Sequence, residues 1–118
     1  MRLFIAAALA LASTAAAAQF VNMLKGGPAE FFDDTDVRMF LEVARKTLDE
    51  GGDNQTLSWK NPKTGHGGDL TVLKRFESKG RPCKEVRVRN EAQGRKSDLR
   101  HNVCTVDGKW RLVGKSQL

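Results

Sequence analysis

Residues 83–104 read CKEVRVRNEAQGRKSDLRHNVC, an alternation of apolar and polar residues on both sides of Gln93-Gly94. This alternation is typical of two antiparallel strands joined by a two-residue turn. Such a turn places Cys83 directly opposite Cys104, in a non-hydrogen-bonded pair whose close Cα atoms suit a disulfide. We therefore expect one disulfide, which closes a loop of about twenty residues and stabilises the fold by about 3 kcal/mol.

The same register predicts which residues surround the disulfide. Both cysteines fall on the face that carries the charged residues of the hairpin, while the opposite face carries Val86, Val88, Leu99 and Val103. Either the disulfide fastens the solvent side of the sheet, or a bulge shifts one strand by a residue near its end.

Further strands flank this hairpin, because turn residues recur about every twelve positions along the chain after Gly52. Leu70, Val72 and Phe76 alternate along a strand from about residue 69 to 77, and Ser78-Lys79-Gly80 turns the chain after it. Shorter strands are expected at residues 56–59 and, after the Asp107-Gly108 turn, around Trp110 and Leu112. Together with the hairpin they predict an antiparallel meander of four to five strands.

One amphipathic helix precedes the strands. Its expected buried stripe has the spacing of a single helix face and consists of Val37, Phe40, Leu41, Ala44 and Leu48. Asp33, Asp34 and Asp36 crowd its start, where carboxylates cap free N–H groups; a metal or acid–base role for them is the weaker alternative. Gly51-Gly52 ends it with a residue free to adopt a positive φ. The fold class is therefore α+β, one N-terminal helix packed on the meander.

Two segments come before this helix. Residues 1–18 combine a positive start, an apolar run of about ten residues and small residues, which is typical of a bacterial signal peptide cut near Ala18. The run is too short for a membrane span, and no cysteine stands at the cleavage point to carry a lipid anchor. Residues 19–32 form an irregular lead segment whose Phe20 and Met23 can pack on the domain. We expect a periplasmic or secreted protein with one domain at residues 33–118.

The net charge of the chain indicates which kind of partner the domain binds. The chain has 118 residues and a formal net charge of +6, with 20 Lys+Arg against 14 Asp+Glu, so it is basic and too short for large enzyme folds. The candidate contacts for an acidic partner are Arg87, Arg89, Lys96 and Arg100, and the partner is another envelope protein or an acidic envelope surface such as lipid phosphates. Few aromatic residues interleave these cations, which disfavours a nucleic-acid interface.

No group of residues predicts chemistry. His66 and His101 lack neighbours at metal-ligand spacing, and no phosphate loop, dinucleotide motif or nucleophile motif is present. We therefore assign no catalytic residue, metal or cofactor. Trp59 and Trp110 are either ligand-stacking platforms or core residues that hold the helix to the sheet.

A set of turn, tryptophan and cysteine positions resembles a known family. Trp59 precedes an Asn-Pro-x-Thr-Gly turn at 61–65, Gly68 and Cys83 follow, and Cys104 stands shortly before an Asp-Gly-x-Trp segment at 107–110. This pattern resembles the carboxy-terminal domain of the bacterial 17 kDa surface antigen family over roughly residues 32–113. The resemblance gives a structural role to Trp59, Asn61, Pro62, Thr64, Gly65, Gly68, Asp107, Gly108 and Trp110.

The resemblance implies a surface-associated envelope domain of unassigned activity. Family members commonly carry a lipidated cysteine and a glycine zipper before this domain, and neither is found here. We expect a non-catalytic interaction or structural module. The alternatives are a small secreted hydrolase acting on an acidic polymer, and an inhibitor or accessory subunit of another periplasmic protein.

Overall fold

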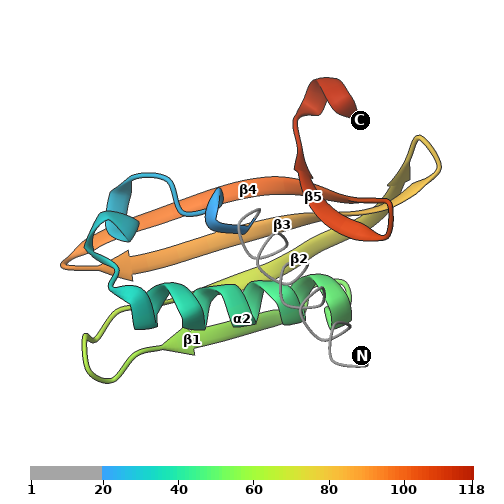
Figure 1. The fold of residues 1–118 in the computed structure, drawn as a ribbon. Coiled ribbons are helices and arrows are strands. Elements are labelled where there is room, and N and C mark those ends of the chain that lie inside the picture. Colours follow the sequence, from blue (N-terminus) through green and yellow to red (C-terminus); the bar gives the residue numbers. More distant parts are fainter. Residues whose placement is uncertain (1–19) are drawn as a thin grey trace, which may run out of the picture.

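Two layers make up the molecule, a five-stranded antiparallel sheet and one long helix that lies across one face of it (Figure 1). The computed structural model describes residues 20–118, so the expected signal peptide lies outside the described residues. The strands follow one another in the sheet in chain order and are β1 (Thr56–Lys60), β2 (Gly67–Ser78), β3 (Arg81–Ala92), β4 (Arg95–Val106) and β5 (Lys109–Val113). The helices are η1 (Gly27–Phe31), α2 (Asp34–Glu50) and η2 (Lys115–Gln117). The predicted α+β meander is confirmed.

Three two-residue turns set the register of the sheet. In each, both central residues have positive φ, which matches the twist of the strands they join. Glycine holds the second position in every turn, and the pairs are Lys79-Gly80, Gln93-Gly94 and Asp107-Gly108. The Gln93-Gly94 turn pairs Ala92 with Arg95, and the register continues without a break to Cys83 opposite Cys104.

The disulfide joins Cys83 to Cys104, whose Cα atoms are 4.0 Å apart. It lies on the face of the sheet away from α2, which we call the outward face, and both cysteines are nevertheless buried. The bulge considered as an alternative is absent from the β3–β4 pair; instead it lies in β2, between Val72 and Lys74. The extra residue reverses the alternation, so Phe76 pairs with Cys83 on the outward face and the expectation that it shares a face with Leu70 was wrong.

Helix α2 begins with a reciprocal capping box, in which the side chains of Asp33 and Asp36 each accept a hydrogen bond from the other residue's backbone N–H. Its buried stripe is rotated slightly from the expected one: Phe40, Ala44 and Leu48 are buried, but Val37 and Leu41 are only half-buried. Asp36 and Thr47 complete the stripe, and Asp36 has no exposed surface. A carboxylate therefore lies between the helix and the sheet.

The C-terminal end of α2 differs from the expected glycine cap. Gly51 has φ −70°, so it does not use the positive φ that glycine allows. Glycine is needed there because a Cβ would overlap the Thr47 carbonyl oxygen and lie 3.0 Å from Val72 Cγ2. The last carbonyl groups of the helix are bonded by a lysine from the sheet, described below.

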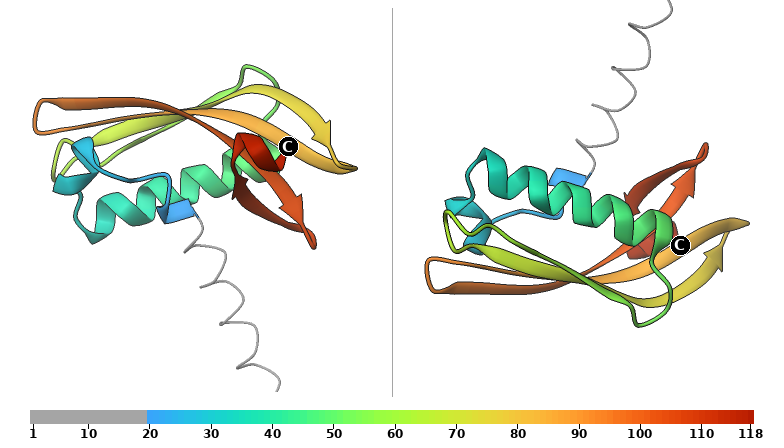
Figure 2. Two further views of the ribbon diagram at one scale, coloured as in Figure 1. Left: turned by 90° about the horizontal axis from the view of Figure 1, so that it is seen from above. Right: turned by 90° about the horizontal axis from the view of Figure 1, so that it is seen from below.

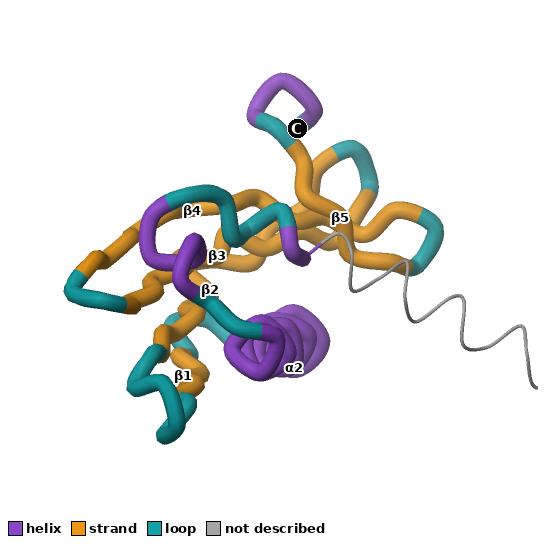
Figure 3. Tube along the Cα trace, turned by 60° about the vertical axis from the view of Figure 1, so that its left-hand side comes forward, coloured by secondary structure: helices purple, strands orange, loops and turns teal. Residues whose placement is uncertain are grey.

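The sheet curves around α2, as the view along the helix shows (Figure 3). The lead segment lies on the same side of the sheet as the helix (Figure 2), and its Phe20 and Met23 join the buried core. Residues 27–31 form the short helix η1, so the segment is not irregular throughout. Leu99 faces the helix side as expected, yet 42% of it is exposed because this part of β4 extends past β5 at the margin of the sheet, away from α2. None of the helices in residues 20–118 has both the length and the apolar character that crossing a membrane requires.

Candidate functional site

The Asp36 carboxylate holds the β1–β2 turn against the helix. Asn61 Nδ2 and Thr64 Oγ1 each donate to Asp36 Oδ1 over 2.9 Å, and His66 Nδ1 is hydrogen-bonded to Oδ2 over 2.8 Å. The backbone N–H of Asp33 supplies a fourth hydrogen bond. Three polar residues of the Asn-Pro-x-Thr-Gly-His turn therefore meet one carboxylate, which explains why the turn needs these residue types. We call this group the Asp36 cluster, defined by Asp36, Asn61, Thr64 and His66.

The carboxyl of Asp36 is ionised at neutral pH. Burial acts to raise its pKa, but the hydrogen bonds from the Asp33 backbone, His66, Asn61 and Thr64 together lower that pKa below its ordinary value. A buried carboxylate is tolerated only when its lone pairs are satisfied, and here four hydrogen bonds converge on two oxygens. The Asp36 cluster is thus a satisfied polar joint between α2 and the sheet.

His66 and Asp36 have the arrangement of an acid–base dyad, and both members are buried and hydrogen-bonded within the domain. The Nδ1 atom of His66 lies 2.8 Å from Asp36 Oδ2, and its Nε2 atom lies 3.1 Å from the side-chain amide of Gln93. Both ring nitrogens are occupied, and only 6% of the His66 side chain is exposed. His66 therefore links the helix to the β3–β4 turn.

Trp59 and Gly68 belong to one row of residues across the sheet. Trp59 pairs with Gly68, Gly68 with Asn90, and Asn90 with Ser97. The Trp59 indole packs edge-on against Phe32, with ring centroids 5.2 Å apart, and joins the core cluster. Of the two interpretations of Trp59, the core position is the one observed. Its Nε1 atom and Asn90 Oδ1 are buried beside Gly68 without a hydrogen-bond partner among the described residues.

Gly68 is required by this close approach, and we expect Gly68→Ala to lower the free energy of unfolding by about 1–3 kcal/mol. The added Cβ would overlap the Arg89 carbonyl oxygen and Asn90 Oδ1, and would lie 3.0 Å from Trp59 Nε1. Urea denaturation followed by tryptophan fluorescence measures the change. Gly52→Ala is the control, because no atom lies within 4 Å of its added Cβ. Equal stability of the two variants would contradict the packing role of Gly68.

Lys84 makes a buried polar contact with α2 that the sequence did not predict. It lies on the helix side of β3, where its Nζ donates to the carbonyl oxygens of Thr47, Leu48 and Gly51 over 2.7–3.3 Å. The ammonium also lies 5.4 Å from the ring centroid of Trp110, which gives this half-buried tryptophan its packing role. Burial lowers the pKa of Lys84, while the negative end of the helix dipole favours its charged form. Lys84 therefore caps the C-terminus of α2.

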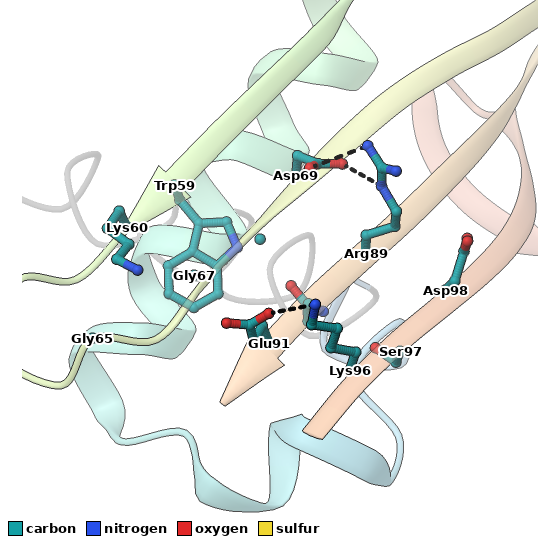
Figure 4. A pocket seen from close by; sticks show the side chains of 12 residues that line it. Trp59, Lys60, Gly65, Gly67, Asp69, Arg89, Glu91, Lys96, Ser97 and Asp98 are labelled. Carbon is teal, nitrogen blue, oxygen red and sulfur yellow. Dashed lines mark hydrogen bonds and ion pairs between the residues drawn. The ribbon is translucent and has the colours of Figure 1, made fainter. Parts of the chain in front are cut away.

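A shallow hollow of about 600 Å³ opens beside the Gly67-Gly68 segment, and charged residues of the outward face line it (Figure 4). Arg89 Nε donates to Asp69 over 3.1 Å, and Lys96 Nζ lies 3.4 Å from Glu91. Gly67 pairs with Lys60 on β1 and with Glu91 on β3. Because glycine has no side chain, the backbone of β2 is uncovered between those two residues. The hollow is polar, and both signs of charge surround it.

The four candidate contacts for an acidic partner all lie on the outward face, but three of them already have carboxylate partners. Arg87 pairs with Asp98, Arg89 with Asp69, and Lys96 with Glu91. Arg100 stands directly opposite Arg87 and, among the described residues, has no carboxylate within ion-pair distance. Arg100 is therefore the cation of this group whose charge is least compensated.

The two histidines occupy separate environments. His101 lies on β4 opposite Val86, with Nε2 buried and unpartnered among the described residues, and desolvation lowers its pKa so that it is neutral at neutral pH. Within residues 20–118 no group of three or more His, Cys, Asp or Glu side chains is arranged to hold a metal ion. The remaining motif residues Asp107 and Gly108 form the β4–β5 turn.

The amino-acid sequence matches one known protein family. A sequence model of the family described as 17 kDa outer membrane surface antigen matches residues 46–111, which is more than half of the chain. No curated protein and no solved structure matches. The matched range includes the turn of the Asp36 cluster, Trp59, Gly68, Lys84 and the disulfide. The chain is a member of the 17 kDa outer membrane surface antigen family.

Proposed function

We propose that this protein is an exported envelope domain that works by binding, not by catalysis, and that its outward face adheres to acidic lipid headgroups of the envelope. The charge on that face carries the proposal. Rows of paired residues across β1–β4 present six cations, Lys60, Lys74, Arg87, Arg89, Lys96 and Arg100, against four carboxylates, Asp69, Glu85, Glu91 and Asp98. Two arginines that face each other across strands repel, which an external anion relieves.

A lipid surface suits this face better than a folded protein does. One central row consists of Thr56, Thr71, Arg87 and Arg100, and its neighbour of Ser58, Asp69, Arg89 and Asp98. Neither row contains the buried aromatic or aliphatic anchor on which protein interfaces depend. Adhesion to an anionic membrane needs only cations close to the surface, each contributing about 1 kcal/mol.

Co-sedimentation with vesicles tests the proposal. The protein is expected to bind phosphatidylglycerol vesicles at low salt, to be released at high salt, and to leave phosphatidylcholine vesicles unbound. Reversing two cations that have no carboxylate within ion-pair distance among residues 20–118, Lys60→Glu with Arg100→Glu, should weaken binding at least about tenfold.

The control is the double variant Arg38→Glu with Lys46→Glu on α2, which changes the net charge by the same amount on the helix layer. It should weaken vesicle binding less than the double variant of the outward face does. Equal loss in both double variants would mean that net charge alone attracts the protein. Equal binding to both kinds of vesicle would also overturn the proposal.

A further inference from the structure

Strand β4 has an edge without a neighbour. Strand β5 pairs only with Asn102–Val106, so residues 95–101 have β3 on one side and no strand on the other. We call residues 95–101 the free edge. Seen from above, it runs along the margin of the sheet, while the lead segment lies on the helix side (Figure 2).

Three residues of the free edge direct their backbone groups away from the sheet. The two-residue turn makes Ala92–Arg95 a hydrogen-bonded pair, and alternation then makes the pairs of Lys96, Asp98 and Arg100 with β3 non-hydrogen-bonded. The short Cα distance at the Cys83–Cys104 pair, which has the same parity, fits this alternation. No backbone hydrogen bond from another described segment reaches these three residues. Their N–H and C=O groups are therefore available to an added strand.

The side chains of the free edge define what would pair with it. Lys96, Asp98 and Arg100 share the outward face, where Asp98 is bound to Arg87 and Arg100 lacks a carboxylate partner among the described residues. On the helix side, Leu99 is 42% exposed. An occupant with carboxylates beside Lys96 and Arg100 and an apolar residue beside Leu99 would complement all three.

We propose that the free edge of β4 accepts an extended acidic segment of a partner protein as an additional strand. Backbone hydrogen bonds to Lys96, Asp98 and Arg100 hold the segment, and a carboxylate beside Arg100 supplies the missing countercharge. This surface goes beyond the proposed lipid adhesion, because it uses the backbone of one strand and not the charge of the whole face.

A second copy of the chain fits the edge less well. Pairing two β4 edges about Asp98 would place Lys96 of one copy opposite Arg100 of the other, and Asp98 opposite Asp98, so like charges would meet. Shifting the register to pair Asp98 with Arg100 would bring the second copy's Lys96 to Asn102, where Val113 already lies. A third register, which pairs Lys96 with Asp98 of the other copy, would match those charges but would place Arg100 opposite Gly94, where no carboxylate is available. Only a partner of different sequence, with a carboxylate beside Arg100, compensates every charge of the free edge.

Backbone amide exchange on the unmodified protein gives the first test. The probe is a capped synthetic peptide in which valine alternates with threonine or glutamate, with its two glutamates four positions apart. We expect it to slow exchange at Lys96, Asp98 and Arg100, whereas Ser97, Leu99 and His101 are already protected by β3. Absence of protection at the first three amides would overturn the proposal, as would equal protection by a peptide with lysine in place of glutamate. Protection at high protein concentration without peptide would show a second copy as the occupant and would also overturn it.

Two substitutions at one position give the second test. Asp98→Pro removes an outward N–H without touching the hydrogen bonds to β3, so the domain should keep its fold and lose peptide affinity about tenfold or more. Asp98→Ala keeps that N–H, removes a carboxylate and frees Arg87, so it should bind the peptide at least as well. Equal loss in both variants would contradict strand addition. Vesicle binding is measured on the same variants, and its retention in Asp98→Pro separates failure of this proposal from failure of lipid adhesion.

Discussion

Asp36→Ala is expected to lower the free energy of unfolding by about 3–5 kcal/mol, because it leaves several buried groups without an acceptor. Asn61 Nδ2, Thr64 Oγ1 and His66 Nδ1 are all hydrogen-bonded to this carboxylate, and the residue has no exposed surface. Urea denaturation at neutral pH measures the loss. The β1–β2 turn should also loosen, which faster amide exchange at residues 61–66 would report.

Asp34→Ala is the matched control, since Asp34 lies in the same helical turn but is exposed. Its loss removes only a favourable charge near the helix N-terminus, with an expected cost below about 1 kcal/mol. Similar costs for the two variants would show that the Asp36 cluster contributes no more than a surface charge does.

The Asp36 carboxyl also makes the free energy of unfolding depend on pH in the acidic range. Its folded pKa is lowered, so the stabilisation is complete above the ordinary value of about 3.9 and is lost as the pH falls through the folded pKa. Unfolding free energies measured from neutral pH down to about pH 3 should therefore fall more steeply for the native protein than for Asp36→Asn. Parallel curves would assign the acid sensitivity to other carboxylates.

Removing the disulfide is expected to lower the free energy of unfolding by about 3 kcal/mol while leaving the sheet register intact. The cysteines are 21 positions apart, so the bond constrains a hairpin-sized loop in the unfolded chain. The register should survive because the Gln93-Gly94 turn and the alternating pairs of β3 and β4 define it independently. The double variant Cys83→Ala with Cys104→Ala, compared by urea denaturation, gives the magnitude.

Dithiothreitol provides the control for this change. It should destabilise the native protein by about the same amount as the double substitution and leave the double variant unaffected. A variant that folds with different β3–β4 pairs would mean that the disulfide, and not the turn, sets the register, whereas a variant that unfolds entirely would mean that the bond contributes more than the expected amount. A variant as stable as the oxidised protein would remove any stabilising role for the bond.

The local parts of this fold could be predicted from the sequence, and the long-range polar contacts could not. The Gln93-Gly94 turn fixed the opposition of Cys83 and Cys104 because strand alternation extends a local signal over many residues. The bulge after Val72 has no comparable signal, and it moved Phe76 to the other face.

The Asp36 cluster was recognised only in part. Capping by Asp36 followed from its place at the helix start, but its partners lie 25–30 residues further along the chain, beyond the reach of periodicity. One signal was available: Asp36 falls four residues before Phe40 and eight before Ala44, on the buried stripe. A carboxylate on that stripe needs polar partners, and the Asn-Pro-x-Thr-Gly-His turn is rich in them. Lys84 was hidden in the same way, because its acceptors belong to a distant helix end.

The neighbour-to-neighbour order of the strands bears on how quickly the molecule assembles. Because each strand pairs with the one next to it in the chain, every pairing closes a short loop, and closing short loops costs little entropy. Contacts between residues close in sequence go with fast folding. The sheet can therefore form hairpin by hairpin, and the two thiols can meet across a paired β3 and β4 before any oxidant reaches them.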